Sequence, residues 1–277
     1  MTFSLDQMPQ VTLNNGQTIP QLGLGVYKVT QKIAEVLVLE AIERGYRRID
    51  TASLYDNEPE VGSAIRRSGL PREELFLTTK IWHDHHGYDD TLEAIDEALD
   101  RLKIQYIDML LIHWPVPRLG KYLETWHAFE EAQKSGRIRG IGVSNFEPAH
   151  LQTLIDGSTT VPAINQVELN PGFQQPVVRE FNAKHGIATE AWSPLARGRM
   201  NEHPTLVALV AKHGKSAAQI VLRWHLQLGN LVIPKTSNPD RLSENIDVFD
   251  FELDASDMAA MLAMDTGIRT GLDPNEF

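Results

Sequence analysis

The stretch "RRIDTASLYDNEPEVGSAI", residues 47–65, begins in the pattern of a short strand and ends in the pattern of a helix. Asp50 stands at the end of the strand, and Tyr55 lies in the turn that follows it. A strand that leads through a short loop into a helix is one βα unit. The fold therefore depends on how often the chain repeats this unit.

The same unit recurs along the whole chain. Amphipathic stretches such as "LEAIDEALDRL" (residues 92–102) carry apolar residues at helical spacing. Glycines that suit the C′ position of a helix follow such stretches at residues 45, 69, 136, 186 and 229. We expect strands at about residues 22–27, 47–50, 75–80, 107–114, 138–145, 163–169, 187–193 and 231–235. Eight repeats predict an α/β fold and favour a closed (β/α)8 TIM barrel over a doubly wound open sheet.

A β-hairpin is predicted ahead of the first barrel strand. In "VTLNNGQTIPQLG", residues 11–23, Asn15 and Gly16 stand between arms of alternating apolar residues. We expect a type I′ turn, with positive φ at both central positions, and a hairpin that caps the bottom of the barrel. No Pro/Gly/Ser-rich or low-complexity tract marks a boundary, so residues 1–277 are expected to form a single domain.

The composition narrows the possible partners. The 26 Lys and Arg against 37 Asp and Glu give a net charge of -11, which disfavours nucleic acid and anionic membrane surfaces. Cysteine is absent, which excludes disulfides, thiolate zinc sites and thiol nucleophiles. Residues 1–10 lack the basic and apolar regions of a signal peptide, and no apolar run approaches the ~18 residues of a membrane span. We expect a cytoplasmic protein.

Ionisable residues end three consecutive strands. Asp50 and Tyr55 follow the second strand, Lys80 ends the third and His113 ends the fourth. Alone, Asp50 is typical of a turn cap, Lys80 of a surface charge and His113 of a buried core histidine. Together they lie at the carboxyl ends of the strands, where barrels carry their active sites, and strand alternation turns three of them inward. The sequence therefore predicts a catalytic site at this rim.

The chemistry of this cluster suits proton transfer to an oxygen atom. A buried Lys80 needs an anion, which Asp50 supplies. The lysine should lower the pKa of Tyr55 from about 10 toward the working range, which makes Tyr55 a candidate proton donor and acceptor. His113 could hold the same oxygen in place. No member is a strong nucleophile, so the set indicates reduction of a carbonyl with a hydride from a cofactor.

The strand ends also offer a nucleotide site of an unusual kind. Gly23 and Gly25 lack the third glycine of a Rossmann motif. Trp192 could instead stack on a flat ring, while a carboxamide could be bound by Ser144, Asn145 and Gln166. After the eighth strand, Asn238 is expected to be the N-cap of a helix. A phosphate at that helix start would meet Lys235, Thr236 and Arg241, although a simple capped helix explains the pattern equally well.

With these motifs, the chain resembles the aldo-keto reductases, which are NADPH-dependent carbonyl reductases on a (β/α)8 barrel. It is most similar to the bacterial branch that includes 2,5-diketo-gluconate reductases. The resemblance spans about residues 10–265 and rests on "GYRRIDTASLYDNE", "LFLTTKIW", "LLIHWP", "RGIGVSNF", "AINQVELNP" and "IPKTSNPDRLSENIDVFDFEL". It implies a catalytic tetrad in which Tyr55 is the general acid, the Lys80–Asp50 pair assists it and His113 orients the carbonyl.

The resemblance also implies the NADPH site. Trp192 would stack on the nicotinamide, Ser193 and Leu195 would contact the pyrophosphate, and Glu244 and Asn245 would lie at the adenine. The full set is Val26, Tyr27, Asp50, Ser144, Asn145, Gln166, Trp192, Ser193, Leu195, Lys235, Thr236, Ser237, Asn238, Arg241, Glu244 and Asn245. Asn238 stands where close relatives have an arginine, so the strength of the preference for NADPH over NADH is left open.

The expected substrates are small aldehydes, ketones or keto-sugar acids. An aromatic pocket would be walled by Tyr27, Trp82 and Trp114 beside His113, and Arg197 would bind a carboxylate unless it is a surface charge. The short C-terminal tail predicts an open site, and the resemblance implies a monomer.

Two other functions are compatible with parts of the sequence. The "HDHH" segment, residues 83–86, could indicate a metal-dependent hydrolase, but it lies in a loop and we expect no metal. A barrel that only carries the nucleotide is the other alternative, and the complete tetrad argues against it.

Overall fold

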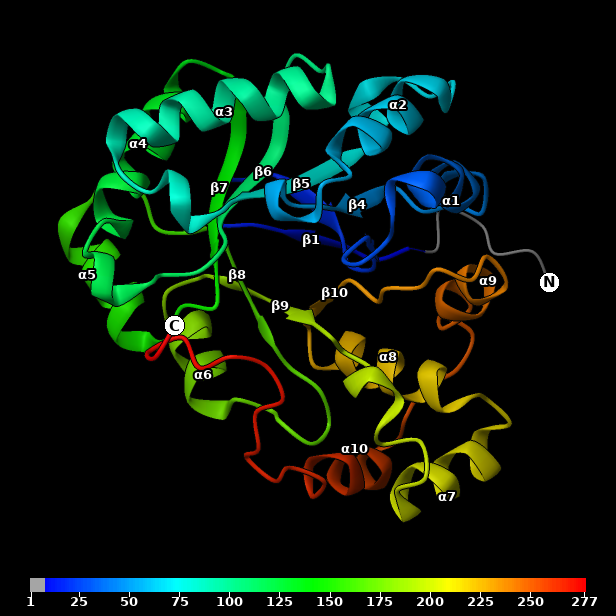
Figure 1. Ribbon diagram of the computed structural model, residues 1–277. Helices are drawn as coiled ribbons and strands as arrows, with labels where there is room; N and C mark the ends of the chain where they lie inside the picture. Colours follow the sequence, from blue (N-terminus) through cyan, green and yellow to red (C-terminus); the bar gives the residue numbers. More distant parts are fainter. Residues whose placement is uncertain (1–7) are drawn as a thin grey trace.

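Eight parallel strands form a closed barrel in the computed structural model, which describes residues 8–277 (Figure 1). The strands are β3 (Leu24–Gly25), β4 (Arg48–Asp50), β5 (Phe76–Ile81), β6 (Ile107–Ile112), β7 (Ile138–Ser144), β8 (Ile164–Glu168), β9 (Ala188–Trp192) and β10 (Leu231–Val232). They pair in chain order, and parallel bridges from Leu22 to Val232 and from Gly25 to Lys235 join the first strand to the last. The predicted (β/α)8 barrel is confirmed. The expectation of no signal peptide concerns residues 1–10, of which residues 1–7 lie outside the described part.

Helices surround the barrel (Figure 1). Those that follow the strands are α1 (Gln31–Glu43), α2 (Glu58–Arg67), α3 (Tyr88–Leu102), α4 (Tyr122–Lys134), α5 (Pro148–Gly157), α6 (Pro176–Lys184), α8 (Ala217–Gln227) and α9 (Asp240–Ile246). Two further helices lie against each other, α7 (Pro204–His213) and α10 (Ala255–Leu262), where Lys212 pairs with Asp254 and Asp257. The glycines at residues 45, 69, 136, 186 and 229 all have φ between 68° and 102°, as predicted for C′ residues.

The N-terminal hairpin pairs β1 (Gln10–Thr12) with β2 (Thr18–Pro20) in antiparallel register. Its turn differs from the prediction, because only Gly16 has positive φ. The Leu13 carbonyl accepts from Gly16 N at 2.9 Å, and Leu13 N donates to the Gln17 carbonyl at 2.8 Å. This is a type I turn with Gly16 in the left-handed position, the common three-residue hairpin loop, rather than a type I′ turn.

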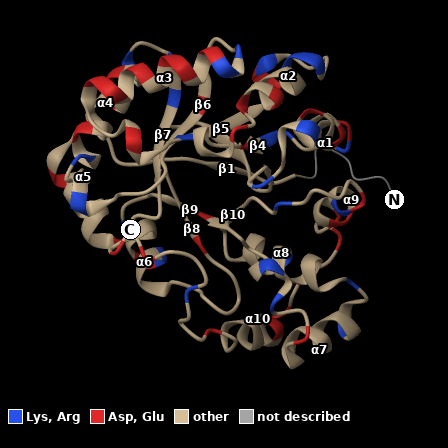
Figure 2. Cartoon of the chain, in the orientation of Figure 1, with Lys and Arg blue, Asp and Glu red and all other residues tan. Residues whose placement is uncertain are grey.

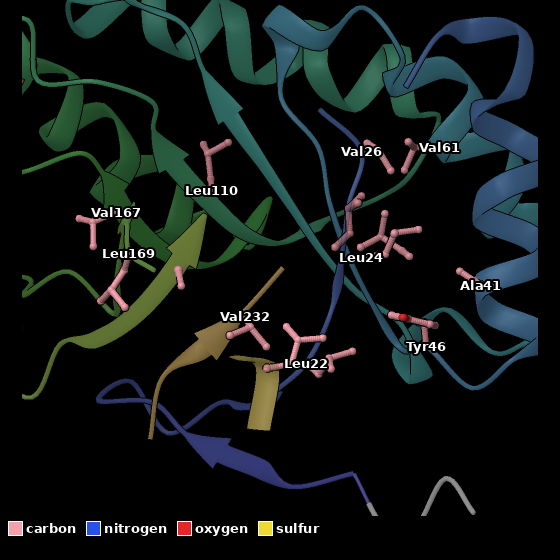
Figure 3. Packing of buried hydrophobic residues seen from close by; sticks show 14 of the residues in the cluster. Leu22, Leu24, Val26, Ala41, Tyr46, Val61, Leu110, Val167, Leu169 and Val232 are labelled. Carbon is pink, nitrogen blue, oxygen red and sulfur yellow. The ribbon is translucent and has the colours of Figure 1, made fainter. Parts of the chain in front are cut away.

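The core has two parts. The larger cluster fills the space between strands and helices, where Leu22 and Val232 lie side by side at the barrel's closing seam (Figure 3). The smaller cluster joins Leu13 and Ile19 of the hairpin to Met109, Leu111 and other residues inside the barrel, so the hairpin caps the bottom. Lys, Arg, Asp and Glu lie mostly on the surrounding helices (Figure 2). Within residues 8–277, no helix combines the length and the apolar character that crossing a membrane requires.

Candidate active site

Asp50, Tyr55, Lys80 and His113 come together at the carboxyl rim of the barrel. Lys80 is fully buried at the end of β5, and its Nζ donates to Asp50 Oδ1 at 2.6 Å and to the Thr51 carbonyl at 2.8 Å. The same Nζ lies 3.3 Å from the Tyr55 hydroxyl, which is carried by the short 3-10 turn Ser53–Tyr55 after β4. Inward alternation along β4, β5 and β6 brings these side chains to one point, as the sequence predicts.

The protonation of Tyr55 differs from the sequence expectation. Burial raises the pKa of Tyr55 to about 12, and the opposing effect of Lys80 does not overcome it. Burial alone would lower the pKa of Lys80, but Asp50 and Tyr55 outweigh it and hold that pKa above its ordinary value. Lys80 therefore stays charged, and Tyr55 keeps its proton at neutral pH.

His113 faces Tyr55 and Trp82 as a neutral ring. Its ring centroid lies 5.7 Å from that of Tyr55 and 5.0 Å from that of Trp82, both in edge-to-face contact. Burial and the positive charge of Lys80 hold the pKa of His113 well below its ordinary value. A neutral imidazole has one N–H, which can donate to a substrate oxygen without competing for the proton-transfer role.

A hydrogen-bonded frame fixes Trp192 beside the tetrad. The Trp192 indole N–H donates to Asn145 Oδ1 at 2.8 Å, and Asn145 Nδ2 donates to the His113 carbonyl at 3.0 Å. Asn145 has a φ of 64°, a left-handed conformation that asparagine tolerates well. Ser144 Oγ donates to the Gln166 carbonyl at 2.9 Å. Both side-chain groups of Asn145 are therefore engaged within the protein, and they set the orientation of Trp192.

A cavity of about 250 Å³ opens above these residues. The predicted residues that line it are Tyr27, Asp50, Tyr55, Trp82, His113, Trp114, Ser144, Asn145, Gln166, Trp192, Ser193, Arg197 and Lys235. Leu54, Ile233 and Leu272 complete an apolar wall. Lys80 lies beneath Tyr55 rather than at the surface of the cavity.

The C-terminal tail covers one side of this cavity, which corrects the expectation of an open site. The Gly271 amide donates to Glu168 Oε2 at 2.8 Å, and a Cβ at Gly271 would lie 2.6 Å from the Trp192 ring. Phe277 packs its ring against Trp114, with centroids 5.0 Å apart, and against Trp82. A short tail thus reaches the pocket because Glu168 anchors it midway.

A second cavity, of about 580 Å³, shares Tyr27, Ser193, Arg197 and Lys235 with the first. Its lining also contains the predicted residues Leu195, Arg241, Glu244 and Asn245. In the part of the chain from residue 8 onward, its cations Lys28, Lys235, Arg197 and Arg241 form no ion pair. Burial and the charge of Lys28 lower the pKa of Lys235, as expected for a partly buried cation beside another cation. This donor set fits a dinucleotide that carries phosphates.

Some predicted cofactor residues lie outside both linings. Val26 is buried in the core, and Thr236, Ser237 and Asn238 form the turn before α9. Thr236 Oγ1 accepts from Asn238 N at 3.0 Å. The helix begins at Asp240 with Pro239 in the cap position, one residue later than predicted, although Asn238 Oδ1 still accepts from Asp240 N.

Three charged residues of the site were missed in the sequence. Lys28 follows Tyr27 at the end of the first strand, and barrel closure alone could have indicated that it lies near Lys235. Arg48 and Glu190 stand two residues before Asp50 and Trp192 on their strands. That spacing turns them into the barrel, which was the available signal.

The histidine segment has an ordinary structural place. His83 contacts Trp82 and Phe277, and His86 is buried with its pKa lowered by burial to about 4. Across residues 8–277, no three His, Cys, Asp or Glu side chains are grouped so as to hold a metal ion.

Residues 21–265 match the Aldo/keto reductase family. The chain belongs to this family. An aldo-keto reductase of Mycolicibacterium smegmatis is 51% identical over 269 residues, which are 97% of this chain and 98% of that protein. The methylglyoxal reductase DkgA of Escherichia coli is 45% identical over 269 residues, covering 96% and 97% of the two chains.

Two solved structures of the family contain the nucleotide. A point mutant of Gox0644 in complex with NADPH matches with a TM-score of 0.93 at 47% identity and covers 97% of this chain and 98% of that chain. The Bombyx mori aldo-keto reductase AKR2E4 in complex with NADP has a TM-score of 0.87 at 39% identity, with 95% and 94% covered. This aldo-keto reductase is therefore an NADP-dependent oxidoreductase that reduces carbonyl groups.

Proposed function

We propose that this aldo-keto reductase converts small aldehydes, ketones or keto-sugar acids to alcohols with NADPH, and that Tyr55 donates the proton. The observation that carries the proposal is the Tyr55 hydroxyl at the floor of an aromatic cavity, 3.3 Å from the buried ammonium of Lys80. The adjoining cavity, whose lining contains Lys28, Lys235, Arg197 and Arg241, supports the presence of the nucleotide beside it.

The cofactor supplies a hydride when bound, and the chain's own residues fix where it can lie. Trp192 offers a flat face held by Asn145. Gln166 uses its amide nitrogen within the protein, so its Oε1 is the atom left to accept from a carboxamide. Lys235 and Arg241, together with Lys28, would hold phosphate groups in the larger cavity.

Tyr55 is suited to the acid role rather than the base role. With its pKa raised by burial to about 12, it holds its proton at neutral pH. As the proton leaves toward the substrate oxygen, Lys80 stabilises the phenolate that forms, and Asp50 keeps Lys80 charged and in place. His113 donates a hydrogen bond to the same oxygen and orients the carbonyl. The direction we propose is therefore reduction.

The size and lining of the smaller cavity support a small substrate. Tyr27, Trp82 and Trp114 accept compact apolar groups, and Arg197 borders the same cavity and forms no ion pair with any residue from 8 to 277. A carboxylate or a second carbonyl on the substrate would be its partner. Methylglyoxal, named for the Escherichia coli relative, is a compact dicarbonyl of this kind. We also propose that the chain acts as a single-domain cytoplasmic monomer. The lack of a boundary tract in the sequence supports the single domain, and the net charge of -11 supports the monomer.

The test is oxidation of NADPH, followed by its absorbance, with a panel of small aldehydes and keto acids. Tyr55→Phe should reduce kcat by about a hundredfold or more, the usual contribution of a general acid. Tyr106→Phe is the matched control, since its buried hydroxyl has no hydrogen-bond partner within the described residues, and the ring that contacts Arg72 and Arg139 is retained. If Tyr55→Phe keeps full activity, the proposed role of Tyr55 is wrong. Repeating the panel with NADH measures the preference that Asn238 leaves open.

A further inference from the structure

A second buried ion pair lies inside the barrel directly below the tetrad. Arg48 and Glu190 are 0% and 1% exposed, and Arg48 Nη2 lies 2.8 Å from Glu190 Oε1. The same nitrogen donates to the Val232 carbonyl at 2.8 Å. Gly23 makes room for this guanidinium, because a Cβ at that position would lie 2.5 Å from Arg48 Nε. Neither side chain belongs to the lining of either cavity.

Gln166 connects this pair to Asp50. Its Nε2 donates to Glu190 Oε2 at 2.7 Å and to Asp50 Oδ2 at 2.8 Å. The two carboxylates fix the orientation of the amide, because the opposite orientation would place its oxygen against both of them. Gln166 and Glu190 are direct neighbours in the register of β8 and β9. One continuous path of contacts therefore runs from Arg48 to the Lys80 ammonium beneath Tyr55.

The charges of these two ion pairs balance when all four groups are ionised. Arg48 and Lys80 are positive, and Asp50 and Glu190 are negative, so their sum is zero. Burial and the charge of Asp50 raise the pKa of Glu190, and Arg48, Gln166 and Lys80 oppose this rise only in part, so Glu190 responds to the charges of both pairs. In a buried site such charges are weakly screened, so adding or removing one changes the protonation of every neighbour.

We propose that Arg48 and Glu190 are a positioning pair for the reaction: through Gln166 they hold the Asp50 carboxylate, and by balancing its charge they set the pH range in which Tyr55 can donate its proton. The proposal rests on the proposed function, in which Tyr55 is the acid. It assigns to the pair an electrostatic effect with a definite sign, which a role in packing alone does not have.

Each single substitution unbalances the charge in one direction. Glu190→Gln leaves a net positive charge, which favours the phenolate of Tyr55 and lowers its pKa. Arg48→Met leaves a net negative charge at alkaline pH, where Glu190 is ionised, and raises that pKa. The double variant Arg48→Met/Glu190→Gln restores a net charge of zero. The other groups that face Tyr55, namely Lys80, Asp50, Tyr27 and His113, are unchanged in all three.

The experiment is the pH dependence of kcat/KM for aldehyde reduction with NADPH, and of alcohol oxidation with NADP+, for wild type and the three variants. Reduction needs protonated Tyr55, so its alkaline limb should move down in Glu190→Gln and up in Arg48→Met. Each shift should be about half a pH unit, less than the one unit or more caused by a charge in direct contact, because Gln166 and Asp50 lie between the pair and Lys80. The acidic limb of oxidation should move with the alkaline limb of reduction. In the double variant both limbs should return to the wild-type position.

The signs decide the outcome. Limbs that stay in place in the single variants, or that move in the same direction in both, overturn the proposal. If one single variant does not fold, the other still shows the direction of the shift, and the double variant shows whether the limb returns to its wild-type position. The control Tyr55→Phe separates the proposed function from the proposal for the positioning pair. If Tyr55→Phe retains activity, the proposed function fails. If Tyr55→Phe loses activity but the limbs of the other variants do not move, only the positioning pair is refuted.

Discussion

Replacing Lys80, alone or together with Asp50, should show that the Lys80–Asp50 pair is needed for activity but adds little net stability. Lys80 is 0% exposed, and its ammonium contacts Asp50 Oδ1, the Thr51 carbonyl and the Tyr55 hydroxyl. Lys80→Met keeps the side chain apolar and of similar length but leaves the Asp50 carboxylate buried without its cation. Breaking a buried ion pair from one side costs about 3–5 kcal/mol. That is a large part of the roughly 5–15 kcal/mol by which domains are ordinarily stable.

The double variant Asp50→Asn/Lys80→Met should regain most of this loss, because no unpaired charge remains from the pair and replacing a whole buried pair is often close to neutral. Gln166 Nε2 can still donate, now to an amide oxygen in place of Asp50 Oδ2. Both variants should lose activity by about a hundredfold or more, since Tyr55 then lacks the cation that stabilises its phenolate.

Urea denaturation followed by tryptophan fluorescence measures the free energy of unfolding, and equal m-values support two-state analysis. Lys212→Met is the control, since Lys212 is 46% exposed and pairs at 2.6 Å with Asp254, which is 57% exposed, so solvent screens the charges. Its second partner, Asp257, is buried but keeps its contact with His213. Lys212→Met should change stability little. A double variant no more stable than Lys80→Met, or equal effects of Lys80→Met and Lys212→Met, would refute the reasoning from burial.

Three further outcomes are expected. Asn145→Ala removes the acceptor of the Trp192 indole, and NADPH should bind roughly tenfold more weakly in a titration by tryptophan quenching; unchanged affinity contradicts a positioning role. Lys235→Met should raise KM for NADPH about tenfold while leaving KM for NADH unchanged, and equal rises would exclude a contact with the 2′-phosphate. In the reduction direction, kcat/KM should be held through neutral pH and fall only as pH rises toward the Tyr55 pKa of about 12, since the donor must be protonated; a pH series with NADPH measures this.

The sequence predicted the strands and the residues at the carboxyl rim, because strands follow from hydrophobic periodicity and the rim follows from the barrel topology. The eight predicted strands overlap β3 to β10, and the four ionisable residues meet because strand ends in a closed barrel share one rim. The hairpin was also predicted, but its turn type was wrong. The dipeptide Asn15-Gly16 fits two loop lengths, and the choice depends on how the arms pair, which puts Thr12 opposite Thr18.

The sequence could not show how deeply each residue is buried inside the barrel or which side chains meet there. The lysine beside Tyr55 was foreseen, but the sign of the pKa shift depends on how much solvent the surrounding strands and tail remove, and burial outweighs the lysine. The tail gave the same difficulty, because its length says nothing about Glu168, the buried carboxylate that brings it over the cavity. Arg48 and Glu190 were missed because their spacing shows only that each points into the barrel, and the folded barrel is needed to show that side chains of β4 and β9 meet there.

The depth profile of the barrel suggests why the charges stand where they do. Its lower part is filled by Leu13, Ile19, Met109 and Leu111, and an apolar filling could have continued to the rim at no cost in buried charge. Instead two ion pairs occupy the layers beneath Tyr55, and each is of little net benefit to stability. A flexible lysine without this support could donate to several different acceptors. Gln166 fixes the Asp50 carboxylate, and the carboxylate in turn fixes the position of the Lys80 ammonium. The ion pairs in the upper half of the barrel therefore add little stability, but they fix the distance between the Lys80 ammonium and the Tyr55 hydroxyl.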